Sequence, residues 1–170
     1  ARGNRLETTT QMAFWLPPGG RSGGFPAYNT EVLSDVLLTK SVAIGLPGRP
    51  NAIDYRVTFE LPRGERHTRA VFEVLTGYMP PEFDTFWGLD RGEPNGLVRL
   101  DVGPGEQPRP ILLATADGAF AMGVIAPGPA PRGCVGPSYG RFAFPRERVN
   151  KWNCVYRAHD PGGLAPGKYA

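Results

Sequence analysis

The sequence is poor in the residues that build most metal and catalytic sites. It contains two cysteines and two histidines among 170 residues. Cys134 and Cys154 are twenty residues apart, and the absence of any CxxC or HxxxH spacing excludes the common zinc motifs. Neither His67 nor His159 lies in a nucleophile motif, and no glycine-rich phosphate loop is present. We therefore expect no cofactor and no bound metal.

Lysine is scarce and long apolar runs are absent. Three of the 19 basic residues are lysines, and the arginines stand singly among 16 acidic residues. The net charge of +3 therefore forms no stripe of the kind that binds nucleic acid. No stretch approaches the roughly 18 apolar residues of a membrane span. These absences argue against nucleic-acid binding and against membrane insertion.

Turn-forming residues are abundant, with 23 glycines and 19 prolines spread along the chain. Such a composition disfavours long helices. The length suits one domain with its own core. The chain has no initiating Met, and it ends at 165–170 in a turn followed by the first residues of a strand. We therefore expect residues 1–170 to be a single domain cut from a longer protein.

Two hairpins stand out in the pattern. The run Ile53–Leu61 alternates apolar and polar residues, which is the period of a half-buried strand. Its odd-numbered residues should face the core, and Thr68–Thr76 should be the return strand. The second hairpin joins Ile111–Thr115 to Ala119–Ile125 through Asp117-Gly118, a pair preferred in primed turns. Both of its strands are almost wholly apolar, which indicates a central position in a sheet.

Further strands are expected along the rest of the chain. They are 7–16, 32–39, 41–46, 97–102, 139–144 and 151–157. The only window with helical spacing is Thr30–Lys40, so a helix there is the alternative to a strand. Many short strands without a βαβ rhythm predict an all-β fold with little helix, an antiparallel two-sheet sandwich or jelly roll.

The segment Gly77–Gly96 interleaves aromatic rings with acids and hydrogen-bonding groups. A sugar has an apolar CH face and a rim of hydroxyls, which such a mixture suits. The candidate sugar-binding residues are Tyr78, Phe86, Trp87, Arg91 and Asn95. The alternative is that the rings plug the core. The exposure of Trp87 separates the two: a solvent-facing ring favours sugar, and a buried ring or one in a flat apolar patch favours packing.

Three acids of the same segment are the weak catalytic candidates. Glycosidases use paired carboxyls, and Glu82 with Asp84, or Asp90 with Glu93, could form such a pair. The alternative is a solvated acidic loop.

Trp15 and Trp152 each stand among apolar neighbours in an expected strand, which predicts two core residues. The other face of the last two strands is cationic, and it either receives an acidic sugar or is simply solvated. Its residues are Arg141, Lys151, Asn153 and Arg157. Cys134 and Cys154 are either a disulfide, which would indicate an oxidising compartment, or two buried thiols.

Taken together, these patterns predict a carbohydrate-related β-sandwich. It would bind a glycan or polysaccharide, or form part of a polysaccharide-active enzyme, in an extracellular or periplasmic location. The alternative is a structural or assembly domain that packs against neighbouring domains of its parent protein.

Overall fold

The computed structural model describes residues 3–62, 67–90, 92 and 96–170, and for His67 and residues 159–163 it describes the backbone alone. The described residues form strands and no helix. Every strand pair whose register is resolved is antiparallel, which confirms the all-β prediction. Backbone contacts divide the chain into unit 1, Ala1–His67 with Ala165–Ala170, and unit 2, Thr68–Leu164. A single domain stays a prediction.

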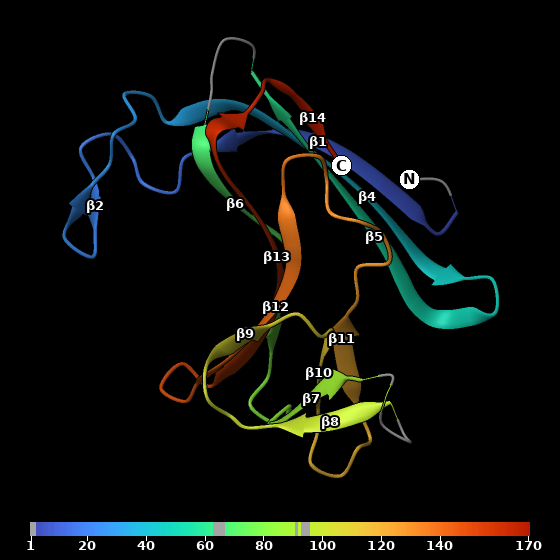
Figure 1. Cartoon of the computed structure of the whole chain (residues 1–170). Helices are drawn as coiled ribbons and strands as arrows, with labels where there is room; N and C mark the ends of the chain where they lie inside the picture. The colour runs from blue at the N-terminus through green and yellow to red at the C-terminus, as the bar shows by residue number, and fades with distance from the viewer. Residues whose placement is uncertain (1–2, 63–66, 91, 93–95) are drawn as a thin grey trace. The chain divides into compact units, whose positions relative to one another are not determined.

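Unit 1 is built on a four-stranded sheet of order β1-β4-β5-β14 (Figure 1). These strands are β1 (Arg5–Ala13), β4 (Leu33–Leu46), β5 (Arg49–Leu61) and β14 (Gly167–Tyr169). A separate two-stranded ribbon pairs β2 (Arg21–Ser22) with β3 (Phe25–Pro26).

Strand β4 occupies most of the Thr30–Lys40 window, so the helix alternative is wrong. The two strands expected at 32–39 and 41–46 form this one continuous strand. The reason is that β4 is hydrogen-bonded on both sides, with Thr39 paired to Thr9 of β1 and to Thr58 of β5. Cross-strand pairing of this kind overrides a local helical spacing.

The alternation in β5 is confirmed as one face of the sheet. Tyr55 pairs with Val42 and Phe59 with Leu38 of β4. This face is buried only at the C-terminal end of β5, since Leu61 is 6% exposed and Ile53 is 53% exposed. The core position expected for Ile53 is therefore wrong.

The hairpin expected between β5 and residues 68–76 is also wrong. Strand β5 pairs with β4 and β14, whereas β6 (His67–Met79) belongs to a different sheet. Local alternation identified both strands but not their partners, because pairing depends on the rest of the chain. The turn chemistry of Pro62–Arg66, which suggested this hairpin, lies outside the described residues from position 63 to 66.

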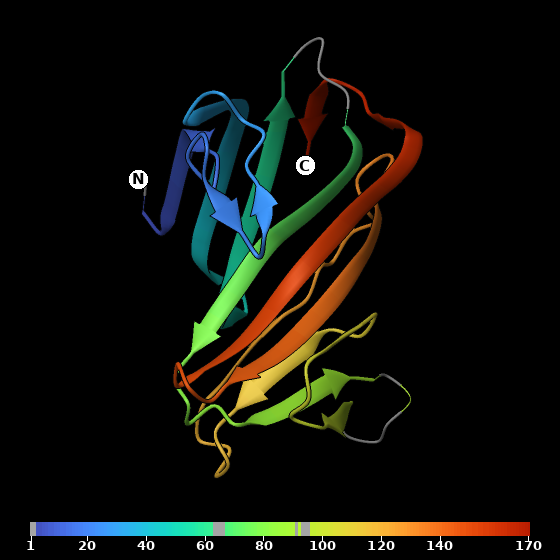
Figure 2. The ribbon, with the colours of Figure 1, turned by 90° about the vertical axis from the view of Figure 1, so that its left-hand side faces the viewer.

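Unit 2 contains two four-stranded sheets, of order β11-β10-β7-β8 and β6-β13-β12-β9. In the second sheet the long strand β13 lies between β6 and β12 (Figure 2). The remaining strands are β7 (Thr85–Leu89), β8 (Leu97–Leu100), β9 (Gly105–Gln107), β10 (Ile111–Ala114), β11 (Ala121–Val124), β12 (Val135–Phe144) and β13 (Val149–Leu164).

The hairpin of β10 and β11 is confirmed, with a longer loop than a two-residue primed turn. Thr115 N–H donates to Phe120 O at 2.9 Å, and Gly118 N–H donates to Thr115 O at 2.9 Å. Gly118, with φ of 71°, adopts a left-handed conformation that glycine tolerates best. Strand β10 is central and buried as expected, but β11 is an edge strand whose Met122 is 45% exposed.

The two sheets of unit 2 share one buried cluster. Its members are Met79, Phe86, Ile111, Leu113, Tyr139, Trp152, Cys154 and Tyr156. Trp152 is 4% exposed, which confirms its predicted core position. Trp15 is 84% exposed, so the same prediction for Trp15 is wrong; it lies beyond the last residue of β1.

Gly77 of β6 lies directly against the Trp152 indole. A Cβ at Gly77 would stand 2.2 Å from the Trp152 ring, closer than any non-bonded carbon pair allows. The ring therefore packs on bare backbone, and this position requires glycine.

We expect Gly77→Ala to lower the free energy of unfolding by about 1–3 kcal/mol, the usual cost of overpacking a core. Gly128→Ala is the matched control, since a Cβ there meets no atom within 4 Å. Thermal and urea unfolding of both variants measure the difference. Equal stability of the two variants would contradict the packing of Trp152 described here.

Candidate functional site

The sugar-binding candidates of the Gly77–Gly96 segment are separated by the fold. Tyr78 on β6 is 67% exposed, whereas Phe86 on β7 is 1% exposed and belongs to the core. A ring as buried as Phe86 has no face free for a ligand, so Phe86 is a packing residue. Arg91 and Asn95 lie outside the described residues.

Trp87 is half-buried and follows Phe86 along β7, so it points to the opposite face of the sheet. It pairs with Leu112 of β10, and the Arg99 guanidinium lies 5.8 Å from the ring centroid. The indole N–H donates to Thr85 Oγ1 at 3.3 Å. A half-buried ring beside an apolar strand residue favours packing over sugar contact at Trp87.

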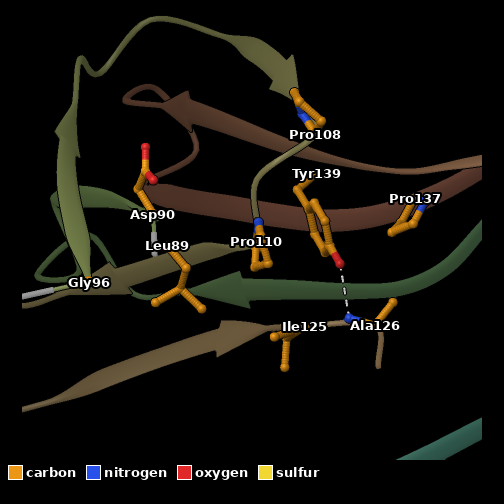
Figure 3. A pocket seen from close by; sticks show the side chains of 9 residues that line it. All are labelled: Leu89, Asp90, Gly96, Pro108, Pro110, Ile125, Ala126, Pro137 and Tyr139. Carbon is orange, nitrogen blue, oxygen red and sulfur yellow. Dashed lines mark hydrogen bonds between the residues drawn. The ribbon is translucent and has the colours of Figure 1, made fainter. Parts of the chain in front are cut away.

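Asp90 lines a shallow hollow of about 500 Å³ in unit 2 (Figure 3). The other lining residues are Leu89, Gly96, Pro108, Pro110, Ile125, Ala126, Pro137 and Tyr139. Asp90 Oδ2 is 3.1 Å from Arg109 Nη2, and Asp90 Oδ1 accepts a hydrogen bond from Gly92 N–H at 2.9 Å. Both carboxylate oxygens of Asp90 are thus engaged by the protein itself.

The three candidate acids of the segment lie in two places, and their catalytic role stays a prediction. Glu82 and Asp84 are exposed residues of the connection between β6 and β7. Asp90 is the only acid among the described residues that line the hollow. Glycoside hydrolysis needs two carboxyls on either side of the bond that is cleaved, and Glu93, the predicted partner of Asp90, lies outside the described residues.

A different surface combines exposed rings with hydrogen-bonding groups, on the sheet β6-β13-β12-β9. Lys151 Nζ lies 5.5 Å from the ring centroid of Tyr78 and 5.4 Å from that of Phe142. Phe142 stacks on Phe144 with centroids 6.2 Å apart. We call Tyr78, Phe142, Phe144 and Lys151 the aromatic platform. It brings together three strands, because Tyr78 comes from β6, the two phenylalanines from β12 and Lys151 from β13.

Glu73 of β6 neutralises the lysine of the platform. Lys151 Nζ is 2.8 Å from Glu73 Oε1, and Thr76 Oγ1 also donates to that oxygen. Partial burial works against ionisation of Glu73, but hydrogen bonds from Lys151, Thr76 and Asn153 outweigh it and lower the pKa of the carboxyl. Glu73 is therefore ionised at neutral pH and paired with Lys151.

A second neutral pair links β13 to β9. Arg157 Nη2 lies 2.7 Å from Glu106 Oε1, and Arg157 Nη1 donates to Ser138 Oγ at 2.7 Å. Ser138 Oγ in turn donates to Glu106 Oε2 at 3.0 Å. The hydrogen bond from Arg157 is the main cause that lowers the pKa of Glu106. Arg157 is thus held by the protein on two sides.

Arg141 does not share a face with Lys151, contrary to the sequence-based expectation. Phe142 is the β12 residue opposite Lys151, and Arg141 stands opposite Trp152. Neighbouring residues of a strand point to opposite faces, which explains why Phe142, and not Arg141, lies on the same face as Lys151. Arg141 Nη2 lies 2.6 Å from Asp101 Oδ1, so it too is paired.

Both cysteines are free thiols in the structure. Cys154 belongs to the core of unit 2, and Cys134 packs against the same cluster. Burial raises the pKa of the Cys154 thiol to about 11 and raises that of Cys134 to a lesser extent. A disulfide between them stays a prediction for an oxidising compartment.

We expect Cys154 to react slowly with Ellman's reagent in the reduced, folded protein, since the thiolate is the reactive form. Its rate should keep rising with pH to about 11. The Cys134→Ser and Cys154→Ser variants separate the two thiols, and Cys134, which is less buried, should react faster. Equal rates in both variants would contradict this environment for Cys154.

No cluster of three or more metal-ligating side chains occurs among the residues whose placement is described. Within the same residues there is no helix of the length and hydropathy that a membrane span requires. No family model matches this chain, and none of the curated proteins or solved structures compared with it matches either. Its function has to be inferred from the geometry of its surfaces.

Proposed function

We propose that unit 2 is a small β-sandwich that binds a glycan on the aromatic platform. The shared core supports the sandwich arrangement, since Phe86 and Leu113 come from one sheet and Trp152 and Tyr139 from the other. Burial of side chains from two four-stranded sheets in one cluster is what face-to-face packing of sheets produces.

The exposed ring of Tyr78 carries the proposal. It is 67% exposed, and Lys151 holds it from one side at 5.5 Å. Carboxylate oxygens of Glu73 lie next to the same ammonium. An apolar ring beside fixed hydrogen-bond acceptors matches a pyranose, which offers an apolar face and a rim of hydroxyls.

An extracellular or periplasmic location, and association with a polysaccharide-active enzyme such as a glycoside hydrolase, would suit such a module. Both stay predictions. The mode of action that we propose for the platform is binding without hydrolysis, because the nearby carboxylates of Glu73 and Glu106 are each held in an ion pair, with Lys151 and Arg157 respectively.

We expect Tyr78→Ala to weaken binding to immobilised polysaccharides at least about tenfold, as the loss of an aromatic anchor does at other binding sites. Mannan, β-glucan and galactan are suitable probes. The melting temperature should stay unchanged, because the ring is mostly exposed. Phe120→Ala is the matched control, since Phe120 is also 67% exposed but lies in the β10–β11 loop. Unchanged affinity in Tyr78→Ala would refute the platform as the binding site.

A second candidate is a structural or assembly domain, and the apolar residues of unit 1 favour it. Ile44 and Ile53 pair across β4 and β5 and are 64% and 53% exposed. Leu6 of β1 is 51% exposed as well. Large apolar side chains gathered on one sheet are typical of surfaces that pack against a partner.

If unit 1 packs against a partner in this way, a fluorescent dye specific for apolar surface should bind the isolated chain. The double substitution Ile44→Ser, Ile53→Ser should reduce that signal and leave the affinity for polysaccharides unchanged. Dye fluorescence equal to that of the unsubstituted chain would count against this second candidate.

A further inference from the structure

The lysine and the arginine of β13 are both paired with acids of the same sheet. Lys151 pairs with Glu73 at 2.8 Å and Arg157 with Glu106 at 2.7 Å. The Lys151 side chain is 15% exposed, so its ammonium is largely enclosed by Glu73 and two aromatic rings. At these two positions the surface therefore offers ionised carboxylates to a ligand and no unpaired cation.

We infer that the platform selects an uncharged glycan over one that carries uronate groups. The inference rests on the proposed function. To pair with Lys151, a uronate on the platform would have to displace Glu73. The carboxylate of the uronate would then lie next to the carboxylate of Glu73. Repulsion between like charges at such short range disfavours that exchange. Hydroxyls of a neutral sugar, by contrast, can donate to carboxylate oxygens that already accept hydrogen bonds from the protein, because a carboxylate has several acceptor positions.

The hairpin turn between β12 and β13 is a competing anion site. It carries Arg146 and Arg148 with Glu147, all exposed. Arg148 has φ of 54°, a left-handed conformation. These arginines lie beyond Phe144 along the chain, so a variant that lacks them distinguishes the turn from the platform.

The test compares mannan, β-glucan and galactan with the same three polymers after oxidation of their C6 hydroxyls to carboxylates. We expect the unsubstituted chain to bind at least one neutral polymer, and to bind its oxidised form at least about tenfold more weakly, a difference of about 1.4 kcal/mol. Binding of the neutral polymer should change little with salt concentration, because no net charge is neutralised.

A gain-of-function variant tests the cause. Glu73→Gln removes the acid and leaves Lys151 without its partner, so binding of the oxidised polymer should strengthen at least about fivefold and become salt-dependent. Glu106→Gln, which releases Arg157, is the second variant if Glu73→Gln unfolds. Glu60→Gln is the matched control: it changes the net charge equally and releases Lys168, 3.4 Å away, on the sheet of unit 1.

Each outcome decides the inference. If oxidised polymers bind the unsubstituted chain as tightly as neutral ones, the inference of neutral selectivity is overturned, but glycan binding is not. If the double variant Arg146→Ala, Arg148→Ala then loses binding of the oxidised polymers, the uronate binds at the turn. An equal gain in Glu60→Gln also overturns it, because net charge alone would then explain the effect. Failure to bind any of the six polymers counts against the proposed function itself.

Discussion

The close approach of Trp152 to Gly77 determines the arrangement of unit 2. The indole packs on β6 at a position without a side chain, and its N–H has no hydrogen-bond partner among the described residues. Its placement thus depends on packing alone. Because side chains alternate along a strand, Lys151 and Asn153 lie on the face of the sheet opposite to Trp152. The core contact on one face of β13 therefore fixes the lysine of the aromatic platform on the other.

The polar face is held together by pairing between strands. Asn153 Oδ1 accepts a hydrogen bond from Gly140 N–H at 2.9 Å, and a Cβ at Gly140 would stand 2.3 Å from that oxygen. Glycine at this position of β12 thus leaves room for the amide of Asn153. Lys151, two residues before Asn153 on β13, pairs with Glu73 of β6 at 2.8 Å, so polar contacts link β6, β13 and β12. Such a network holds the Tyr78 and Phe142 rings at fixed separations from Lys151, which is the preorganisation that stacking on a sugar requires.

The net charge of the chain does not describe the local charge around the aromatic platform. The formal charge of +3 suggests a cationic protein, yet the arginines and the lysine of β12 and β13 are paired with acids from β6, β9 and the segment after β8. Lys151, Arg157 and Arg141 each have a carboxylate within 2.8 Å. The charge of Lys151 in the aromatic platform is therefore balanced by Glu73, and the glycan recognition that we propose there would depend on ring faces and hydrogen bonds.

The sequence alone determined the strand content of this protein, since the alternation at Ile53–Leu61 and the turn at Asp117-Gly118 are local signals that no distant residue alters. It also identified Trp152 as a core residue. The partners of each strand were decided by tertiary structure. Strand β6 pairs with β13, which begins 70 residues beyond the last residue of β6, and that pairing alone brings Tyr78 to Lys151. Likewise Phe86 and Trp87 are adjacent and chemically similar in the sequence, but only the register of β7 against β10 assigns one ring to the core and the other to the opposite face.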